Sequence, residues 1–166
     1  MGNYTERFTA YFERDVAQKA AHSLSDGVRM GFHICEAHSN STVLESFTFF
    51  REAGLNRVIA APSPQGALLK SEIDFHLPKA SAELLLKDST EEIAQIGIAV
   101  VKLILTTDRE RRISVRLGAG FITLLRKGYF GVLTSGGSEL ASFLARNGLS
   151  GMNGIKAALK KMTGEV

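Results

Sequence analysis

The sequence predicts a mixed α+β fold, in which helices pack on a small central sheet and a glycine-rich helical segment follows toward the C-terminal end. Apolar residues make up 45% of the 166 residues and charged residues 22%, a balance typical of chains that fold around a core. Segments in which apolar and polar residues alternate, as in strands, stand between segments with helical apolar spacing. Beyond Leu117 glycine becomes frequent, which favours short elements joined by turns.

The length indicates one domain. A chain of this size is close to the most common domain length and can bury one sizeable core, so we expect residues 1–166 to form a single domain. The change in composition near Gly118 would mark residues 118–166 as a helical C-terminal subdomain, but the pieces beyond that point are too small to fold alone.

The first predicted element is a helix over residues 5–24. Asn3 and Glu6 have the spacing of a capping box, which satisfies the free N–H groups at a helix start. Apolar residues then recur at a four-residue spacing, at Phe8, Phe12, Val16, Ala20 and Leu24. We expect the helix to end before Gly27, because glycine accepts the left-handed conformation at low cost.

Two different elements are predicted next. Residues 28–36 alternate between apolar and polar side chains and indicate a strand with one buried face. For residues 42–54 we favour a helix, since Thr42 and Glu45 form a second capping pattern and an apolar stripe runs on to a closing glycine. The aromatic-rich run 47–50 leaves a strand open as the alternative.

A short buried strand at 57–61 would complete a strand–helix–strand unit, whose expected packing is a right-handed crossover. A break rich in proline follows at 62–66. Residues 71–77 alternate again and predict a half-exposed strand that ends at Pro78.

The second half of the chain begins with a predicted helix at 80–87. The apolar segment 93–105 fits either a buried central helix or a buried strand in a hairpin with residues 113–117, and its periodicity does not separate the two. Brief helices are predicted beyond it, at residues 121–126, 139–146 and 155–162.

Composition also bears on the location of the protein. Cys35 is the single cysteine and cannot form an internal disulfide, so we expect a reducing compartment, the cytoplasm. Residues 1–12 lack the basic and apolar runs of a secretory signal. The uncharged stretch 93–101 is too short to cross a bilayer, and a net charge of +3 is small beside that of dedicated nucleic-acid binders.

The C-terminal helices are the first candidate site. Residues 139–146, a turn at Gly148 and residues 155–162 follow the layout of a helix-turn-helix, whose basic edge would contact nucleic-acid phosphates. The basic residues concerned are Arg146, Lys156, Lys160 and Lys161. Gly151 and Gly154 interrupt the second helix, and an interior glycine costs about 1 kcal/mol relative to alanine. A helical hairpin with a solvated lysine edge is therefore the structural alternative.

A second candidate is a metal site at His33, Cys35 and His38, which lie within six residues. Thiolate and imidazole are zinc-type ligands, and a turn after the strand could bring His38 back to the other two. Structural zinc sites usually contain paired cysteines, so a buried free cysteine beside surface histidines is the alternative.

Two glycine loops are the third candidate. Gly118 and Gly120 lie between a predicted strand and a predicted helix, where backbone amides can bind an anion. Ser135, Gly136 and Gly137 precede the helix at 139–146 in the same way. Both loops lack the remaining residues of nucleotide-binding motifs, so we favour tight turns and helix caps as the explanation of both.

The sequence shows no pair of carboxylates, no nucleophile with a base and no complete ligand set. We therefore predict a non-catalytic binding or assembly module without a cofactor, acting on protein partners. Its surface would be leftover apolar strand edge, which would make it a homo-oligomer. Nucleic-acid binding and metal binding are the two alternatives.

Overall fold

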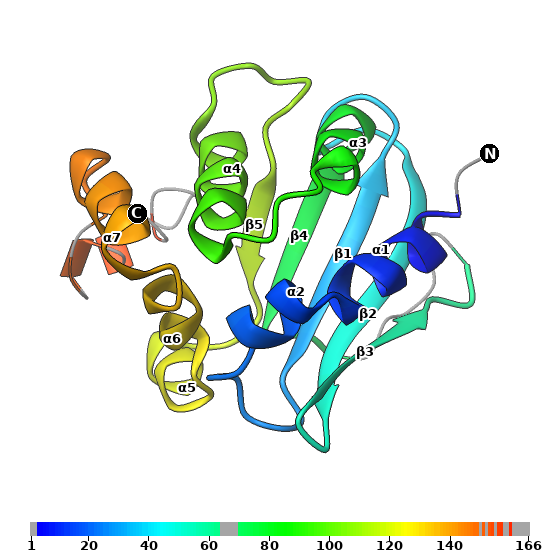
Figure 1. Ribbon diagram of the computed structural model, residues 1–166. Coiled ribbons are helices and arrows are strands. Elements are labelled where there is room, and N and C mark those ends of the chain that lie inside the picture. The colour runs from blue at the N-terminus through cyan, green and yellow to red at the C-terminus, as the bar shows by residue number, and fades with distance from the viewer. Residues whose placement is uncertain are drawn as a thin grey trace.

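A computed structural model describes residues 3–63 and 70–149, together with positions 151, 153, 154, 156, 157 and 160. Its centre is a five-stranded mixed sheet with the strand order β3-β2-β1-β4-β5 (Figure 1). The strands are β1 (Arg29–Cys35), β2 (Val43–Glu52), β3 (Leu55–Ala60), β4 (Ile73–Pro78) and β5 (Ser114–Leu117). The mixed α+β fold predicted from the sequence is confirmed.

The first three strands form an antiparallel meander, and β4 then pairs parallel with β1. Strand β5 closes the sheet antiparallel to β4. The predicted strands at 28–36, 57–61, 71–77 and 113–117 all lie in this sheet, each within a few residues of its predicted ends.

The helix predicted for residues 42–54 is wrong, because this segment is β2. Two residues, Ala53 and Gly54, join β2 to β3, and both have positive φ, 51° and 73°. Such a loop follows the right-handed twist of a hairpin. The expected crossover between β1 and β3 is therefore also wrong, and the parallel pairing joins β1 to β4 instead.

The predicted N-terminal helix is divided in two, α1 (Tyr4–Glu13) and α2 (Asp15–Ala20). The cap at Asn3 is confirmed, since its side chain accepts the N–H of Glu6 at 3.0 Å. The break falls at Arg14, whose backbone is extended and whose guanidinium donates to the carbonyls of Asp88 and Thr90. Tertiary contacts thus interrupt a helix that local spacing would continue.

The remaining helices follow in the order α3 (Lys79–Lys87), α4 (Ile93–Leu105), α5 (Phe121–Arg126), α6 (Tyr129–Thr134) and α7 (Gly137–Arg146). The segment 93–105, which the sequence left open, is a helix. Helix α6 was not expected. The predicted helix at 155–162 lies partly outside the described residues, and its described positions 156, 157 and 160 are helical. No described helix combines the length and apolarity needed to cross a bilayer.

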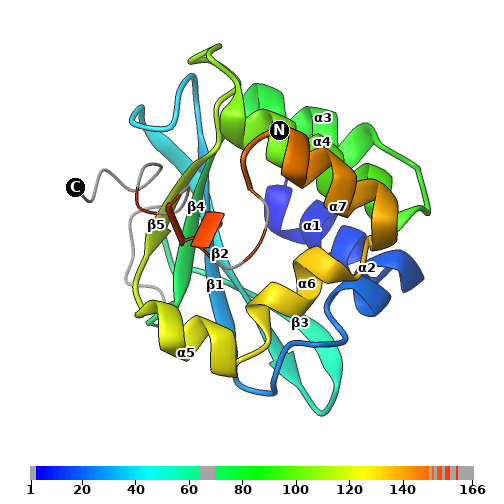
Figure 2. The ribbon, with the colours of Figure 1, turned by 90° about the vertical axis from the view of Figure 1, so that its left-hand side faces the viewer.

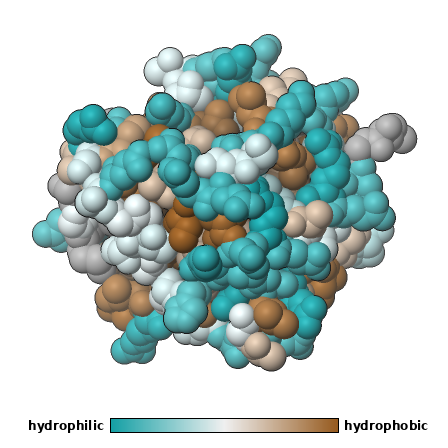
Figure 3. Space-filling view, in the orientation of Figure 1, coloured by the Kyte–Doolittle hydropathy of each residue, from teal (hydrophilic) through white to brown (hydrophobic). Residues whose placement is uncertain are grey.

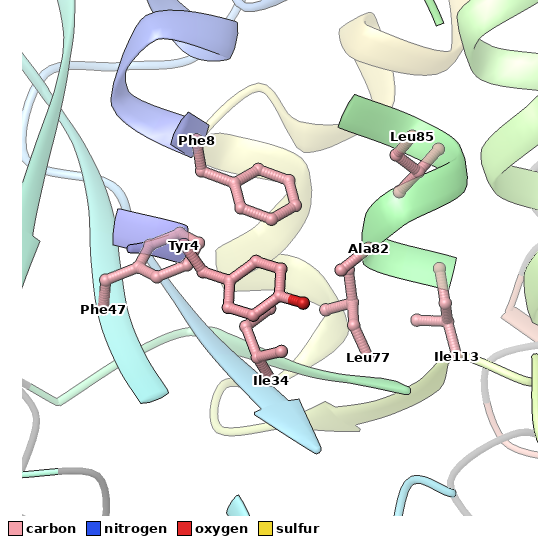
Figure 4. Packing of buried hydrophobic residues seen from close by; sticks show 8 residues of the cluster. All are labelled: Tyr4, Phe8, Ile34, Phe47, Leu77, Ala82, Leu85 and Ile113. Carbon is pink, nitrogen blue, oxygen red and sulfur yellow. The ribbon is translucent and has the colours of Figure 1, made fainter. Parts of the chain in front are cut away.

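The helices cover one face of the sheet. Figure 2 shows the sheet almost edge-on, with all the labelled helices except α5 on the same side of it. Under α1 and α3 lies a buried cluster that includes Phe8, Phe47 and Leu77 (Figure 4). Rings stack across the strands, since Phe32 lies 5.2 Å from Phe47 and 5.1 Å from Phe75, centroid to centroid.

Candidate functional site

An apolar cavity of about 390 Å³ lies between the sheet and its helices. Its floor consists of residues from the helix-facing side of the strands, among them Met30, Phe32, Phe49 and Phe75. Most of its walls come from α1, α2, α4, α6 and α7, while α3 and α5 contribute little. The wall residues include Phe12, Val16, Ile96, Val100, Ile104, Leu133 and Leu140. The space is partly open to the surface, and a cleft with so apolar a lining is a feature of the fold that requires an explanation.

Small side chains on two helices leave this space open. Helix α2 presents Ala17 and Ala20 to the cavity, and α4 presents Gly97. A Cβ atom at Gly97 would lie 2.9 Å from Leu140 Cδ2, so this glycine also lets α7 approach α4 closely. Figure 3 shows hydrophobic side chains in a recess near the centre of the visible face, in the region of α2 and α4.

Helix α4, which borders the cavity, is unusually exposed for a helix of its apolar composition. It holds thirteen residues, IAQIGIAVVKLIL, of which Ala94 is the only one that is buried. Val100 and Ile104, for example, are half-buried although they face the sheet side of the molecule. A helix this apolar normally lies inside a fully packed core, so its partial exposure reflects the unfilled volume beside it.

Two of the polar groups at the cavity wall are already bonded elsewhere. Tyr129 donates its hydroxyl toward Glu72 Oε2 at 3.2 Å, and the Asn56 amide donates to the carbonyl of Phe12 at 2.8 Å. Burial, together with the neighbouring Glu72 carboxylate, raises the pKa of Tyr129 well above its ordinary value. Burial likewise raises the pKa of Tyr11. The cavity therefore offers a guest apolar contact and few free hydrogen-bond partners.

The opposite face of the sheet is polar. His33 lies in the centre of it, with Nδ1 2.9 Å from Ser46 Oγ and Nε2 3.4 Å from Asp74 Oδ1. The rings of His33 and His76 stack at 4.4 Å with an angle of 19° between their planes. Asp74 approaches so closely because Gly31 lies beside it, where a Cβ atom would be 2.0 Å from Asp74 Oδ1.

The electrostatics of this polar face keep His76 neutral. Burial lowers the pKa of His76 to about 4, and the nearby His33 and Arg116 add to the effect while Asp74 opposes it. At neutral pH the two rings therefore stack without repulsion between charged imidazoles. Sequence alternation placed each histidine on the polar face of its own strand. The parallel pairing of β1 with β4 is what brings the two histidines together.

The three predicted metal ligands do not form a cluster. His33 is engaged by Ser46 and Asp74, while His38 Nδ1 accepts the N–H of Asn40. The Cys35 thiol is buried and lies near the carbonyls of His33 and Ser39. Burial raises the pKa of this thiol, which disfavours the thiolate that binds metals. Within the described residues, no group of three or more His, Cys, Asp or Glu side chains could hold a metal ion.

The first glycine loop lines a polar pocket of about 550 Å³. Gly118 and Gly120 connect β5 to α5 as predicted, and a Cβ atom at Gly118 would meet the carbonyl of Ser71 at 2.3 Å. The side chains of Arg29, Lys70 and Lys127 line the same pocket. Glu72, only 8% exposed, accepts from Lys127 Nζ and from the backbone N–H of Arg29. Sequence reasoning identified the glycines but missed these basic residues, which come from three separate segments.

The second glycine loop is explained by packing. Gly136 lies against Leu140, whose Cβ and Cδ2 atoms would both be 2.6 Å from an added Cβ, and Gly137 has a φ of 68°. The Ser135 hydroxyl donates to the carbonyl of Val132. This loop is a close turn between α6 and α7, and the described residues around it show no second feature that would indicate an anion.

Only part of the predicted basic edge lies within the described residues. Arg146 is exposed at the end of α7, and the turn at Gly148 follows with a φ of 74°. Lys156 extends over the ring of Phe121 in α5, 5.5 Å from its centroid, and Lys160 is exposed. Lys161 lies outside the described residues.

Comparison of the chain with protein-family models, with curated proteins and with solved structures gives no match.

Proposed function

We propose that the protein binds an apolar small molecule, or the hydrocarbon part of one, in the cavity between the sheet and α4. The cavity volume carries this proposal. The cavity of about 390 Å³ is partly open to the surface, so when it is empty its apolar lining stays in contact with water, which is unfavourable by roughly 25 cal/mol per Å² of apolar surface. A guest that fills the space would remove much of this apolar surface from water.

The chemistry of the lining indicates the class of guest. The volume falls within the range of about 300–1,000 Å³ that small-molecule sites occupy. Aromatic rings from β1, β2 and β4 form one wall, while α4 supplies branched aliphatic side chains. The nearby hydroxyl of Tyr129 and amide of Asn56 are already satisfied, which favours a guest that is apolar over most of its surface.

A binding assay with Nile red, an uncharged apolar fluorophore, tests the proposal. We expect saturable binding to the wild-type chain. Val100→Phe would occupy part of the cavity from α4 and should weaken binding about ten-fold or more, since a phenyl ring displaces several guest atoms. Ala20→Leu, which fills the cavity from α2, serves as a second variant in case the first one disturbs folding.

Leu84→Phe is the matched control, because Leu84 is 48% exposed on α3 and does not line the cavity. It should bind Nile red like the wild type. If the filled variants remain folded and bind as tightly as the control, or if the wild type shows no saturable binding, the proposal is wrong.

Self-association through β3 is a second proposal, supported by a separate observation. Strand β3 is at one edge of the sheet, and its Leu55 and Ile59 are 46% and 47% exposed. An exposed strand edge with apolar side chains is suited to pairing with a second copy. Light scattering should then give a mass well above 18.0 kDa, and Ile59→Lys should reduce it to that of the monomer. A monomeric wild type would eliminate this proposal.

A further inference from the structure

The outer surface of α5 combines exposed aliphatic side chains with neighbouring basic residues. Helix α5 has six residues, and two of them are exposed aliphatic side chains: Ile122 is 63% exposed and Leu125 is 44% exposed. Ile122 has the highest exposed fraction among the large hydrophobic side chains of the described residues. Figure 3 shows hydrophobic surface at the lower left, where Figure 1 places α5, with hydrophilic side chains beside it.

Basic side chains lie near this aliphatic pair. Arg126 and Lys127 follow it directly in the chain, and Lys156 lies over the ring of Phe121 at the start of the helix. Arg29 and Lys70 line the polar pocket beside α5 together with Thr123 and Lys127. We call Ile122, Leu125 and these basic residues the α5 patch.

The charge of the α5 patch is positive. Glu72 is the one acidic side chain among the described residues lining the pocket, and it is buried and bonded to Lys127, Tyr129 and the backbone of Arg29. The described part of the chain offers no ion-pair partner to Arg29 or Arg126, both of which are exposed. The surface thus presents Arg29 and Arg126 as uncompensated cations near two aliphatic groups.

We infer that the α5 patch docks the protein on an anionic lipid membrane. Peripheral proteins bind bilayers by placing aliphatic side chains at the boundary between headgroups and acyl chains while lysine and arginine attract anionic headgroups. A second copy of the chain fits poorly, because a symmetric contact would place like charges opposite each other. Nucleic acid would use the basic residues but would leave Ile122 and Leu125 without a role.

The position of α5 agrees with this inference. Leu124, on the side of the helix away from the patch, is 1% exposed and lines the apolar cavity. Docking would therefore bring a bilayer to the far side of a helix that borders the cavity. The inference itself rests on the exposed side chains and their charges and holds whatever the cavity binds.

Vesicle co-sedimentation tests the inference. We expect the wild-type chain to bind phosphatidylcholine vesicles in which roughly one third of the lipid is phosphatidylserine, to bind pure phosphatidylcholine vesicles much more weakly, and to lose affinity as salt is added. The double variant Ile122→Ser, Leu125→Ser should bind at least about ten-fold more weakly, because it removes the groups that enter the interface. Arg126→Gln should weaken binding about five-fold, the effect of one cation near an anionic surface.

Matched controls lie elsewhere on the surface. Leu84→Ser removes an equally exposed aliphatic side chain from α3, and Arg146→Gln removes an exposed cation from α7. Both should bind vesicles like the wild type, and thermal unfolding should confirm that all variants are folded. Failure of the wild type to bind the anionic vesicles at low salt would overturn the inference. The inference would also be overturned if the double variant bound the anionic vesicles as tightly as the wild type. If Arg126→Gln abolished binding to heparin but left the vesicle affinity unchanged, the patch would be assigned to another polyanion.

Discussion

The two faces of the sheet are built from alternate residues of the same strands, yet one face borders a cavity and the other is closely packed. On the helix-covered face, large rings such as Phe32, Phe49 and Phe75 surround a cavity of about 390 Å³. On the other face, the small and polar side chains around His33 are bonded to one another at close range. Large apolar side chains therefore do not by themselves fill a core. The difference arises from the covering helices, which place Ala17, Ala20 and Gly97 opposite the rings.

The largest difference between the faces should appear in a pair of neighbouring substitutions. Phe47 is fully buried on the apolar face and contacts Phe8 and Phe32. Phe47→Ala should lower the free energy of unfolding by about 3–5 kcal/mol, since it removes a ring and leaves a cavity. Ser46→Ala, one residue away on the polar face, should cost only about 1 kcal/mol for the lost bond to His33. Denaturant titrations measure both, and equal losses would contradict the assignment of the two faces.

The polar face should also give the fold a dependence on pH. The pKa of His76 in the folded chain is about 4, below the ordinary value of 6.5, so the unfolded chain binds the proton more tightly. The contribution of neutral His76 to the free energy of unfolding is therefore fully present above pH 6.5, and it is lost as the pH falls toward 4.

We expect a loss of about 1–2 kcal/mol over this range, after allowance for partial solvent screening. The charged and titratable groups near the His76 ring are His33, Asp74 and Arg116. His76→Gln should flatten the pH dependence of the unfolding free energy between those values. An equally steep profile in the variant would show that another group is responsible.

The smallest expected effect concerns Thr48, which is 1% exposed on the polar face. Its Oγ1 is buried and has no hydrogen-bond partner among the described residues. Thr48→Val keeps the shape and removes an unsatisfied hydroxyl, so the unfolding free energy should stay within about 0.5 kcal/mol of the wild type or rise. A loss of more than 1 kcal/mol, as expected for a bonded hydroxyl, would show that Thr48 belongs to the network around His33.

Part of this architecture follows from the sequence. A short apolar run indicated β3, and β5 was expected as the strand before the first glycine loop. Alternation located β1 and β4, because one buried face imposes a period of two on each strand. It failed at β2, where Thr42 and Glu45 have the spacing of a capping box. In the structure, Glu45 instead accepts the backbone N–H of Tyr4 and the hydroxyl of Thr5, and so holds the start of α1. Glu45 therefore serves a long-range contact with α1, although its spacing from Thr42 is that of a local helix cap.

The candidate sites were less predictable. The cavity depends on how far α4 is held from the sheet, and no residue pattern specifies that distance. The stacked histidines require the parallel pairing of β1 and β4, which the expected crossover did not provide. Lys156 was identified as part of a basic edge, but its position beside Phe121 in the α5 patch follows only from the tertiary fold. Sequence reasoning found individual residues of these sites but not the partners that other segments supply.

The most direct test of the cavity is a methyl NMR titration of the chain with dodecanol, an uncharged molecule with a long hydrocarbon tail. If the space between the sheet and α4 accepts an apolar guest, the methyl signals of Val100, Ile104 and Leu124, which line the cavity, should shift together and saturate. The exposed methyl groups of Ile59 and Leu84 should remain unchanged. Shifts confined to exposed methyl groups, or no saturable shift at the cavity lining, would contradict the proposed binding site.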